Sequence, residues 1–183
     1  IGLFGGIFGI DGHDRSGIDL RRHLGRGRGG DHGVDVEGFG RIARRAGKPR
    51  IIFLGALDWR PNLDAIDVLL DGVFPAVRRQ VRDAELVVVG RQPSAGLVRR
   101  IAGMEGATLH ADVPDVKPYL GESAVMSVPL RVGGGSRLKI LEALAAGLPV
   151  VSTSIGAEGL DLRHGVHLRI ADSVEDQAAA LVD

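Results

Sequence analysis

From residue 51 onward, short apolar runs rich in β-branched residues alternate with helical patterns. Six runs have strand character, at residues 51–54, 85–89, 108–109, 124–128, 149–152 and 168–170. Helical patterns lie between and after them, at residues 63–77, 95–102, 116–120, 137–146 and 174–182. This alternation is typical of βαβ units, whose strands pair in parallel under helices. The sequence therefore predicts a doubly wound α/β domain with a parallel sheet.

The pattern at residues 63–77 predicts the helix that packs most directly on this sheet. Its apolar residues recur at the three- and four-residue spacing of one helix face. They are Leu63, Ile66, Leu69, Leu70, Val73 and Phe74.

A glycine-rich loop lies between the fourth and fifth predicted strands. Gly133, Gly134 and Gly135 lack side chains, so their backbone amides can approach a ligand closely. Ser136 follows as the predicted N-cap of the next helix, whose free N–H groups and dipole favour an anion. In doubly wound sheets, ligands bind beyond the carboxyl ends of the strands, where this loop is expected.

Charged residues in the following helix extend this chemistry. Arg137 and Lys139 add cations beside the loop. Glu142 lies about 1.7 turns beyond Ser136, where it can reach the hydroxyl-bearing part of the same ligand. Phosphate at one end and hydroxyls at the other indicate a nucleotide or nucleotide-sugar. The alternative is a glycine-rich turn that only permits tight packing, and the Walker A spacing is not formed.

Composition excludes several classes of protein. The 183 residues include 23 basic and 23 acidic side chains, so nothing indicates general attraction to nucleic acid or a membrane surface. The absence of cysteine excludes a disulfide scaffold and a thiolate metal site. No run of about 18 apolar residues is long enough for a membrane span, and no secretory signal pattern opens the chain. We therefore expect a cytoplasmic protein.

Residues 1–50 differ in texture from the rest. They hold half of the 28 glycines, and the stretch from Gly25 to Gly33 is mostly Gly, Arg, Asp and His. This composition predicts a linker rather than a core. The basic run at residues 21–28 leaves RNA binding as an alternative, without interleaved aromatic residues for base stacking. We predict a linker remnant at 1–50 and a domain at 51–183, and Ile1 suggests a fragment or processed chain.

Several segments of the sequence resemble those of a known family. The segment at residues 130–151 is similar to the donor-site segment of the group 1 glycosyltransferases. Further similarities lie at residues 53–55, 86–90, 113–116, 119–120 and 156–160, and residues 32–35 resemble the end of the family's first domain. The resemblance implies the GT-B fold, in which two Rossmann-like domains face a cleft. It covers about residues 30–183 and implies the C-terminal, donor-binding half.

The resemblance also implies residue roles. Two glutamates separated by seven residues mark the donor site, and the second falls on Glu142, which would hydrogen-bond the ribose hydroxyls. The first, which contacts the transferred sugar, falls on Gly134, so that contact is absent and the sugar's identity stays open. The amides of Gly134, Gly135 and Ser136 would hold the diphosphate.

The remaining donor contacts are implied by the loops after the first strands. The family carries an Arg/Lys pair that binds the phosphates, and this pair is only partly present after Gly55. Arg60 is a candidate for the arginine, and Lys139 or Arg137 for the missing lysine. For each of them a surface role is the alternative. The nucleobase would lie near Gly90, Arg91 and the Val113 backbone. Trp59 is either a stacking residue or packs under the helix at 63–77.

The implied reaction is transfer of a sugar from a nucleotide diphosphate-sugar to an acceptor glycan or lipid, with retention of configuration. Stabilisation of the leaving diphosphate would carry the chemistry, and we expect neither a metal nor another cofactor. His110 beside Asp112 is the nearest metal candidate, and a strand-end hydrogen bond explains it more simply. Because the acceptor domain would be missing, we expect donor binding without sugar transfer, and no catalytic residue is assigned.

Three alternatives remain at this stage. The chain is consistent with a GT-B relative such as a sugar-nucleotide epimerase or phosphorylase. It is also consistent with a binding module that uses the nucleotide without catalysis, which Gly134 at the first glutamate position favours. A receiver-like domain would use Asp58 and Asp112 with Lys139, but no acidic pair follows the first strand.

Overall fold

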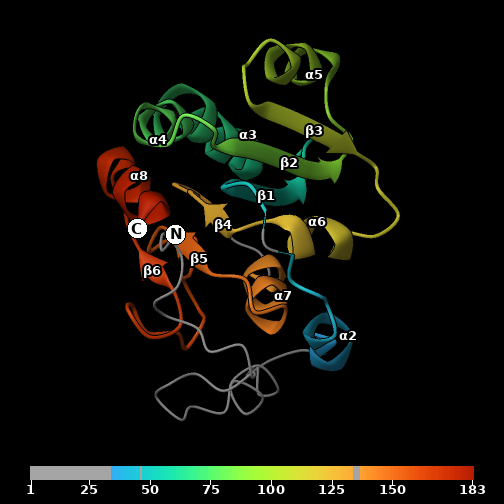
Figure 1. Ribbon diagram of the computed structural model, residues 1–183, viewed down its shortest axis with the longest axis vertical. Coiled ribbons are helices and arrows are strands. Elements are labelled where there is room, and N and C mark those ends of the chain that lie inside the picture. Colours follow the sequence, from blue (N-terminus) through green and yellow to red (C-terminus); the bar gives the residue numbers. More distant parts are fainter. Residues whose placement is uncertain (1–33, 46, 134–136) are drawn as a thin grey trace.

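The computed structural model describes residues 34–45, 47–133 and 137–183. In this part of the chain, six parallel strands form one sheet in the order β3-β2-β1-β4-β5-β6 (Figure 1). The strands are β1 (Arg50–Ala56), β2 (Glu85–Arg91), β3 (Ala107–Ala111), β4 (Val125–Val128), β5 (Val150–Ser152) and β6 (Arg169–Ile170). This arrangement confirms the predicted doubly wound parallel sheet.

Helices cover the sheet in two layers (Figure 1). One layer holds a continuous helical run, α3 (Arg60–Val68), η1 (Leu69–Val73) and α4 (Phe74–Gln80), against which α8 (Val174–Val182) packs. The other layer holds α6 (Lys117–Glu122), which packs against β1, and α7 (Leu138–Ala145), which packs against β5. The helix α5 (Ala95–Ala102) packs on β3, at the end of the sheet. A short helix, α2 (Val36–Gly40), lies on α7 and was not predicted.

The core lies on both faces of the central strands. Residues 51–54 of β1, 86–89 of β2 and all of β4 are buried. Such continuous apolar runs are expected of parallel strands that are covered on both sides. Ile52, Phe53 and Leu86 have no solvent exposure and fix the centre of the sheet. This packing holds the carboxyl ends of the strands in place.

Several predicted boundaries need correction. The helix expected at 63–77 runs from Arg60 to Gln80 and contains a wide π turn at residues 69–73. Pro61 at the start fits a first helical turn, so the helix begins earlier. Pro75 has no N–H to donate to the carbonyl four residues before it, and the wide turn accommodates this loss. The N-cap of α7 is Arg137, and Ser136, which the sequence predicts as the N-cap, lies outside the described residues.

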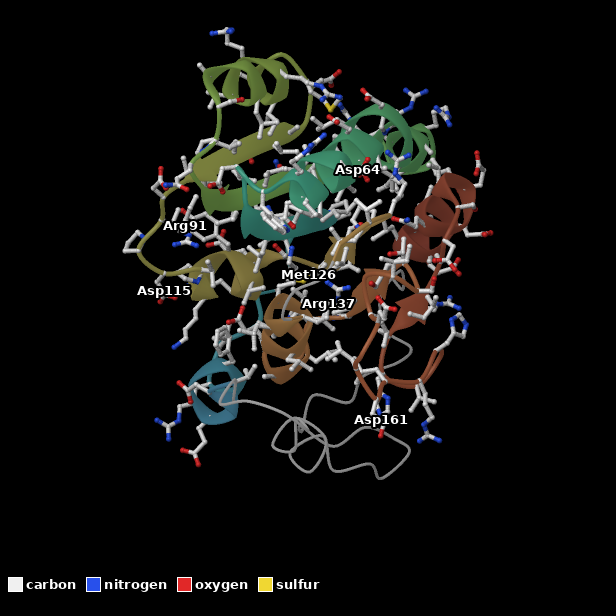
Figure 2. All side chains as sticks on the ribbon, turned by 180° about the vertical axis from the view of Figure 1, so that it is seen from behind. Asp64, Arg91, Asp115, Met126, Arg137 and Asp161 are labelled. Atoms are coloured by element: carbon white, nitrogen blue, oxygen red, sulfur yellow. The ribbon has the colours of Figure 1, made fainter. Side chains whose placement is uncertain are left out.

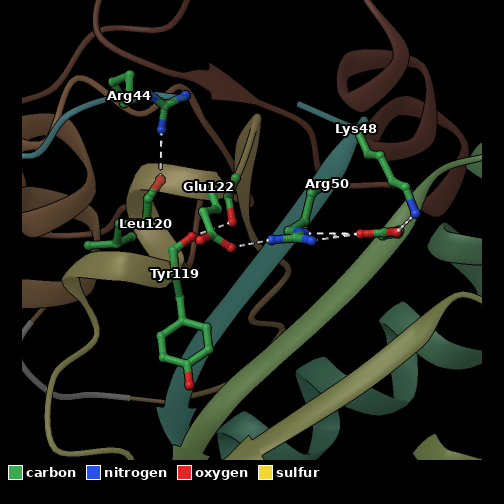
Figure 3. A network of polar contacts seen from close by, with 8 residues as sticks. Arg44, Lys48, Arg50, Tyr119, Leu120 and Glu122 are labelled. Atoms are coloured by element: carbon green, nitrogen blue, oxygen red, sulfur yellow. Dashed lines mark hydrogen bonds and ion pairs between the residues drawn. The ribbon is translucent and has the colours of Figure 1, made fainter. Parts of the chain in front are cut away.

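A polar network anchors the segment that leads into β1 (Figure 3). The Arg44 guanidinium donates to the Leu120 carbonyl at 2.9 Å. Arg50, the first residue of β1, donates to Glu85 of β2 and to Glu122 of α6, each at 2.9 Å. These bonds hold the amino ends of β1 and β2 together, at the edge of the sheet opposite the predicted site.

Candidate functional site

The strand order places a topological switch point between β1 and β4. From β1 the chain proceeds outward to β2 and β3, whereas β4 begins the other half on the opposite side of β1. Ligands of doubly wound sheets bind at such a point, beyond the carboxyl ends of the strands. The loops that leave β1 and β4 meet there: a β-carbon placed on Gly133 would lie 3.0 Å from Pro61 Cβ. Gly133 has φ +122°, which glycine adopts readily.

The residues predicted to lie near the nucleobase are at the same edge of the sheet. Gly55 pairs with Gly90 in the parallel register, and Gly90 pairs with Ala111. Arg91 follows at the exposed end of β2, and Val113 lies just beyond β3, partly buried against the core. The structure therefore gathers Gly90, Arg91 and Val113 at one edge of the sheet, beside Gly55 at the end of β1, and their contacts with a nucleobase stay a prediction.

Lys139 reaches this edge from the first turn of α7. Its ammonium donates to the Asn62 side-chain oxygen at 2.9 Å and lies 4.8 Å from the centre of the Phe53 ring. Burial lowers the pKa of Lys139 to about 8, and the positive charge of Arg137 acts in the same direction. The negative charge of Glu142 offsets part of this shift. Burial of this ammonium beside the switch point therefore costs desolvation free energy, and an anionic ligand bound there would stabilise its charge.

Asn62 is a site residue that the sequence analysis missed. The residue is 7% exposed, and its side-chain amide nitrogen donates to the Ala56 carbonyl at 2.9 Å. The residue therefore joins the end of β1 to Lys139 of α7. The only available signal was its position after Pro61 at a helix start, which does not reveal a partner 77 residues away.

Glu142 lies one turn after Lys139 on α7 and is half-buried. Desolvation raises the pKa of its carboxyl group above the ordinary value, and the charge of Lys139 offsets part of that shift. A half-buried carboxylate beside a lysine can accept hydrogen bonds from ligand hydroxyls.

Arg137 takes part in the packing of the loop. Its side chain is 9% exposed, and its guanidinium donates to the Ile155 carbonyl at 2.8 Å and the Gly133 carbonyl at 3.2 Å. It lies near the centre of the molecule, whereas Arg91 is at the periphery (Figure 2). Arg137 thus ties the loop after β4 to the turn after β5.

The two candidates in the loop after β1 are exposed. Trp59 has 55% of its surface accessible, so of its two alternatives packing under the helix is excluded, and stacking on a ligand remains a prediction. Arg60 begins α3 and is exposed beside it. Both lie next to Pro61 and therefore near the loop that contains Gly133.

Other predicted features need separate mention. Gly134, Gly135 and Ser136 lie outside the described residues, so their predicted contacts with a diphosphate stay predictions. His110 packs against the Tyr119 ring, with 4.7 Å between ring centres, while Asp112 accepts a hydrogen bond from the Gln92 amide. The proposed strand-end bond between His110 and Asp112 is thus replaced by two separate contacts. Within the described ranges, no three His, Asp or Glu residues are grouped to hold a metal ion.

Among the described residues, no helix combines the length and the apolar character that crossing a bilayer requires.

The fold and the site define a doubly wound domain with charged side chains beyond the carboxyl ends of its strands. Comparison with known proteins identifies its family. The model of the family described as "Glycosyl transferases group 1" matches residues 48–183. The chain therefore belongs to the group 1 glycosyl transferases. This membership excludes the receiver-like alternative.

Two curated relatives indicate how far the similarity extends. Phosphatidyl-myo-inositol mannosyltransferase of Mycobacterium tuberculosis is 36% identical over 162 residues, which cover 83% of this chain and 42% of the relative. A GDP-mannose-dependent alpha-(1-6)-phosphatidylinositol monomannoside mannosyltransferase of the same species is 28% identical, over 74% of this chain and 38% of the relative. The chain thus spans about two fifths of the length of these relatives.

A solved structure agrees at the level of the fold. TarM of Staphylococcus aureus, crystallised as a mutant with Fondaparinux, alpha-GlcNAc-glycerol and UDP, superposes with a TM-score of 0.60 at 15% identity. The superposition covers 74% of this chain and 28% of TarM. At that identity the likeness concerns the fold alone.

Proposed function

We propose that this chain forms the donor-nucleotide site of a glycosyltransferase, which transfers a sugar from a nucleotide diphosphate-sugar to an acceptor. The observation that carries the proposal is that Lys139 and Glu142 lie one turn apart on α7, with the Lys139 ammonium held by Asn62 at the switch point of the sheet. This arrangement offers a cation for phosphate and a carboxylate for hydroxyls on one helix.

The chemistry that these residues support is stabilisation of a leaving diphosphate. Negative charge develops on the diphosphate as the glycosidic bond breaks, and a fixed ammonium in a partly buried site stabilises that charge strongly. Lys139 provides this cation, with Arg60 as a second candidate at the exposed edge. Glu142 would orient the donor through the ribose hydroxyls. We propose transfer with retention of configuration and without a metal ion, as the family resemblance implies.

The relatives' names suggest which donor to test first. Both curated relatives are named as mannosyltransferases, and one is named as dependent on GDP-mannose. We therefore propose a guanine nucleotide as the first candidate, with uridine and adenine nucleotides as alternatives. An acceptor glycan or lipid would be bound mainly by residues outside this chain, since the relatives are more than twice as long.

Calorimetric titration of this chain with GDP, UDP and ADP tests the donor site. The proposal predicts saturable binding of one nucleotide that weakens at least about tenfold in Glu142→Ala. Glu175→Ala, on the exposed first turn of α8, is the matched control and leaves affinity unchanged. Equal affinity in the two variants would contradict the assigned role of Glu142.

A binding module without catalysis is the second candidate. Gly134 occupies the position at which the family carries its sugar-contacting glutamate, and this favours nucleotide binding without transfer. Product analysis with a longer form that includes an acceptor domain separates the candidates. A transferred sugar supports the glycosyltransferase, an epimerised donor supports the epimerase alternative, and an unchanged donor supports the binding module.

A further inference from the structure

Asn62 connects three elements through one buried amide. Its nitrogen donates to the Ala56 carbonyl at the end of β1, and its oxygen accepts from the Lys139 ammonium of α7, both at 2.9 Å. Asn62 itself lies in the first turn of α3. The side chain thus bridges the two halves of the sheet at the switch point, through residues 77 positions apart in the sequence.

The backbone around this amide is shaped to fit it. A β-carbon placed on Gly55 would lie 2.7 Å from the Asn62 amide nitrogen, closer than real β-carbons approach. Gly55 therefore leaves the space that the amide fills. Both polar ends of a 7% exposed side chain have partners, as a buried polar group requires.

The second partner of this amide is a lysine that would otherwise be mobile. A lysine side chain has a flexible four-carbon stem, and holding its head in one place requires a fixed contact. Asn62 supplies that contact, and the Phe53 ring lies against the ammonium at 4.8 Å. The ammonium has three N–H donors, of which Asn62 uses one. Within the described residues the ammonium makes no further hydrogen bond, so its other donors can meet a ligand oxygen.

An amide holds the lysine without neutralising it. The nearby pair of Arg131 and Asp64 shows the alternative, in which a carboxylate compensates the cation. An Asp at position 62 would place a negative charge on the Lys139 ammonium and cancel the charge that an anionic ligand needs. The other charged groups acting on Lys139 are Arg137 and Glu142, both on or next to α7.

We propose that Asn62 is a positioning residue, which fixes the Lys139 ammonium at the switch point so that its remaining N–H donors meet the diphosphate of the donor nucleotide. This inference rests on the donor-site function proposed above. Asn62 acts through Lys139 and, on this view, sets affinity for the diphosphate but not for the nucleoside.

The test measures Lys139 directly and without ligand. The chain has three lysines, Lys48, Lys117 and Lys139, so carbon-13 labelling of lysine resolves each side chain in an NMR pH titration. The wild-type pKa of Lys139 is expected near 8. Asn62→Asp is expected to raise it by about one unit or more, because a carboxylate favours the ammonium. Asn62→Ala is expected to lower it, because the acceptor is lost while burial remains.

Binding supplies the second readout. At pH 7, Asn62→Asp is expected to weaken nucleoside diphosphate binding about tenfold and to leave binding of the nucleoside alone unchanged. Asp67→Asn, on the exposed side of the same helix, is the control and moves neither the pKa nor the affinity. The amide NMR spectrum of each variant verifies that it is folded.

The outcomes separate this inference from the proposed function. If Lys139 titrates alike in wild type, Asn62→Asp and Asn62→Ala, the positioning role is overturned even where nucleotide binds. If the pKa moves as expected but the diphosphate and the nucleoside lose affinity equally, Asn62 positions Lys139 without serving the diphosphate, and the inference is overturned. If wild type binds no nucleotide, the donor-site function fails, and the diphosphate role fails with it.

Discussion

A β-carbon on Gly90 would lie 2.0 Å from the carbonyl oxygen of Gly55, its neighbour across the parallel pair. At position 90 there is therefore no room for even a methyl group. The Leu57 amide donates to the Arg91 carbonyl at 2.7 Å directly beyond this pair, so both strands turn together into their loops. The closeness of Gly55 and Gly90 therefore sets where the loops of the candidate site begin.

This contact predicts that Gly90→Ala destabilises the fold. The added methyl group would meet backbone rather than a flexible side chain, and such overpacking costs about 1–3 kcal/mol of unfolding free energy. Gly96→Ala in α5 is the matched control, because its β-carbon has 3.8 Å to its nearest neighbour. It should stabilise the chain by about 0.5–1 kcal/mol. Urea unfolding of the two variants measures both values, and equal stability would contradict the account.

The lowered pKa of Lys139 predicts a specific pH dependence of stability. The unfolded chain keeps the lysine proton up to the ordinary pKa of 10.5, whereas the folded chain releases it near 8. Between these values the unfolded state binds more protons, so the free energy of unfolding rises with pH. From pH 8 to 10, wild type should gain about 2 kcal/mol relative to Lys139→Met.

Lys48→Met is the control for this measurement. Lys48 is exposed and pairs with Glu85 at the other edge of the sheet. Its removal should leave the pH-dependent gain in place, whereas Lys139→Met should abolish it. A gain of equal size in wild type and Lys139→Met would show that burial of this ammonium is not the cause.

Glu142 is expected to lower the stability of the folded chain and to favour nucleotide binding. Because the pKa of its carboxyl group is raised in the folded state, stability falls as pH rises from the ordinary value through the folded one. At pH 7, above the ordinary value, the raised pKa of this carboxyl group therefore lowers stability, and Glu142→Gln should stabilise the chain at pH 7 more than at pH 4. The same variant should bind nucleotide about tenfold more weakly. Thermal unfolding and calorimetry measure the two effects, and a variant that is less stable at pH 7 would be inconsistent with this reasoning.

Arg137 predicts a structural contribution to the loop. Its buried guanidinium holds the Gly133 and Ile155 carbonyls together, so Arg137→Met should lower the free energy of unfolding by about 1–3 kcal/mol. Arg131→Met, which breaks an exposed pair with Asp64, should have a much smaller effect. Denaturant titrations compare the two variants. Similar losses would mean that the two carbonyl contacts contribute little.

The layers of this fold could be predicted because the spacing of the apolar residues indicates which faces of the strands and helices are buried. The runs at 51–54 and 85–89 became β1 and β2, and the face containing Ile66, Leu69 and Val73 became buried as expected. The π turn was not predictable from that pattern, since a wide turn keeps the same residues inside. Helix α2 was missed because its segment is short and lies in a glycine-rich stretch.

The site was predicted only in part, for a different physical reason. Lys139 and Glu142 belong to one helix, so local spacing placed them together. The partner of Lys139 comes from α3, and a hydrogen bond between distant segments leaves no local pattern. For Trp59 the sequence left two alternatives open, stacking on a ligand or packing under the helix, and the 55% exposure of this residue excludes the second.

One calorimetric experiment decides whether the switch point holds a donor-nucleotide site. Wild type, Glu142→Ala and Glu175→Ala are titrated at pH 7 with GDP, UDP and ADP. We expect saturable binding of one nucleotide to wild type and to Glu175→Ala, weakened at least about tenfold in Glu142→Ala. No binding to wild type, or equal binding to all three proteins, would mean that Glu142 and the switch point do not form such a site.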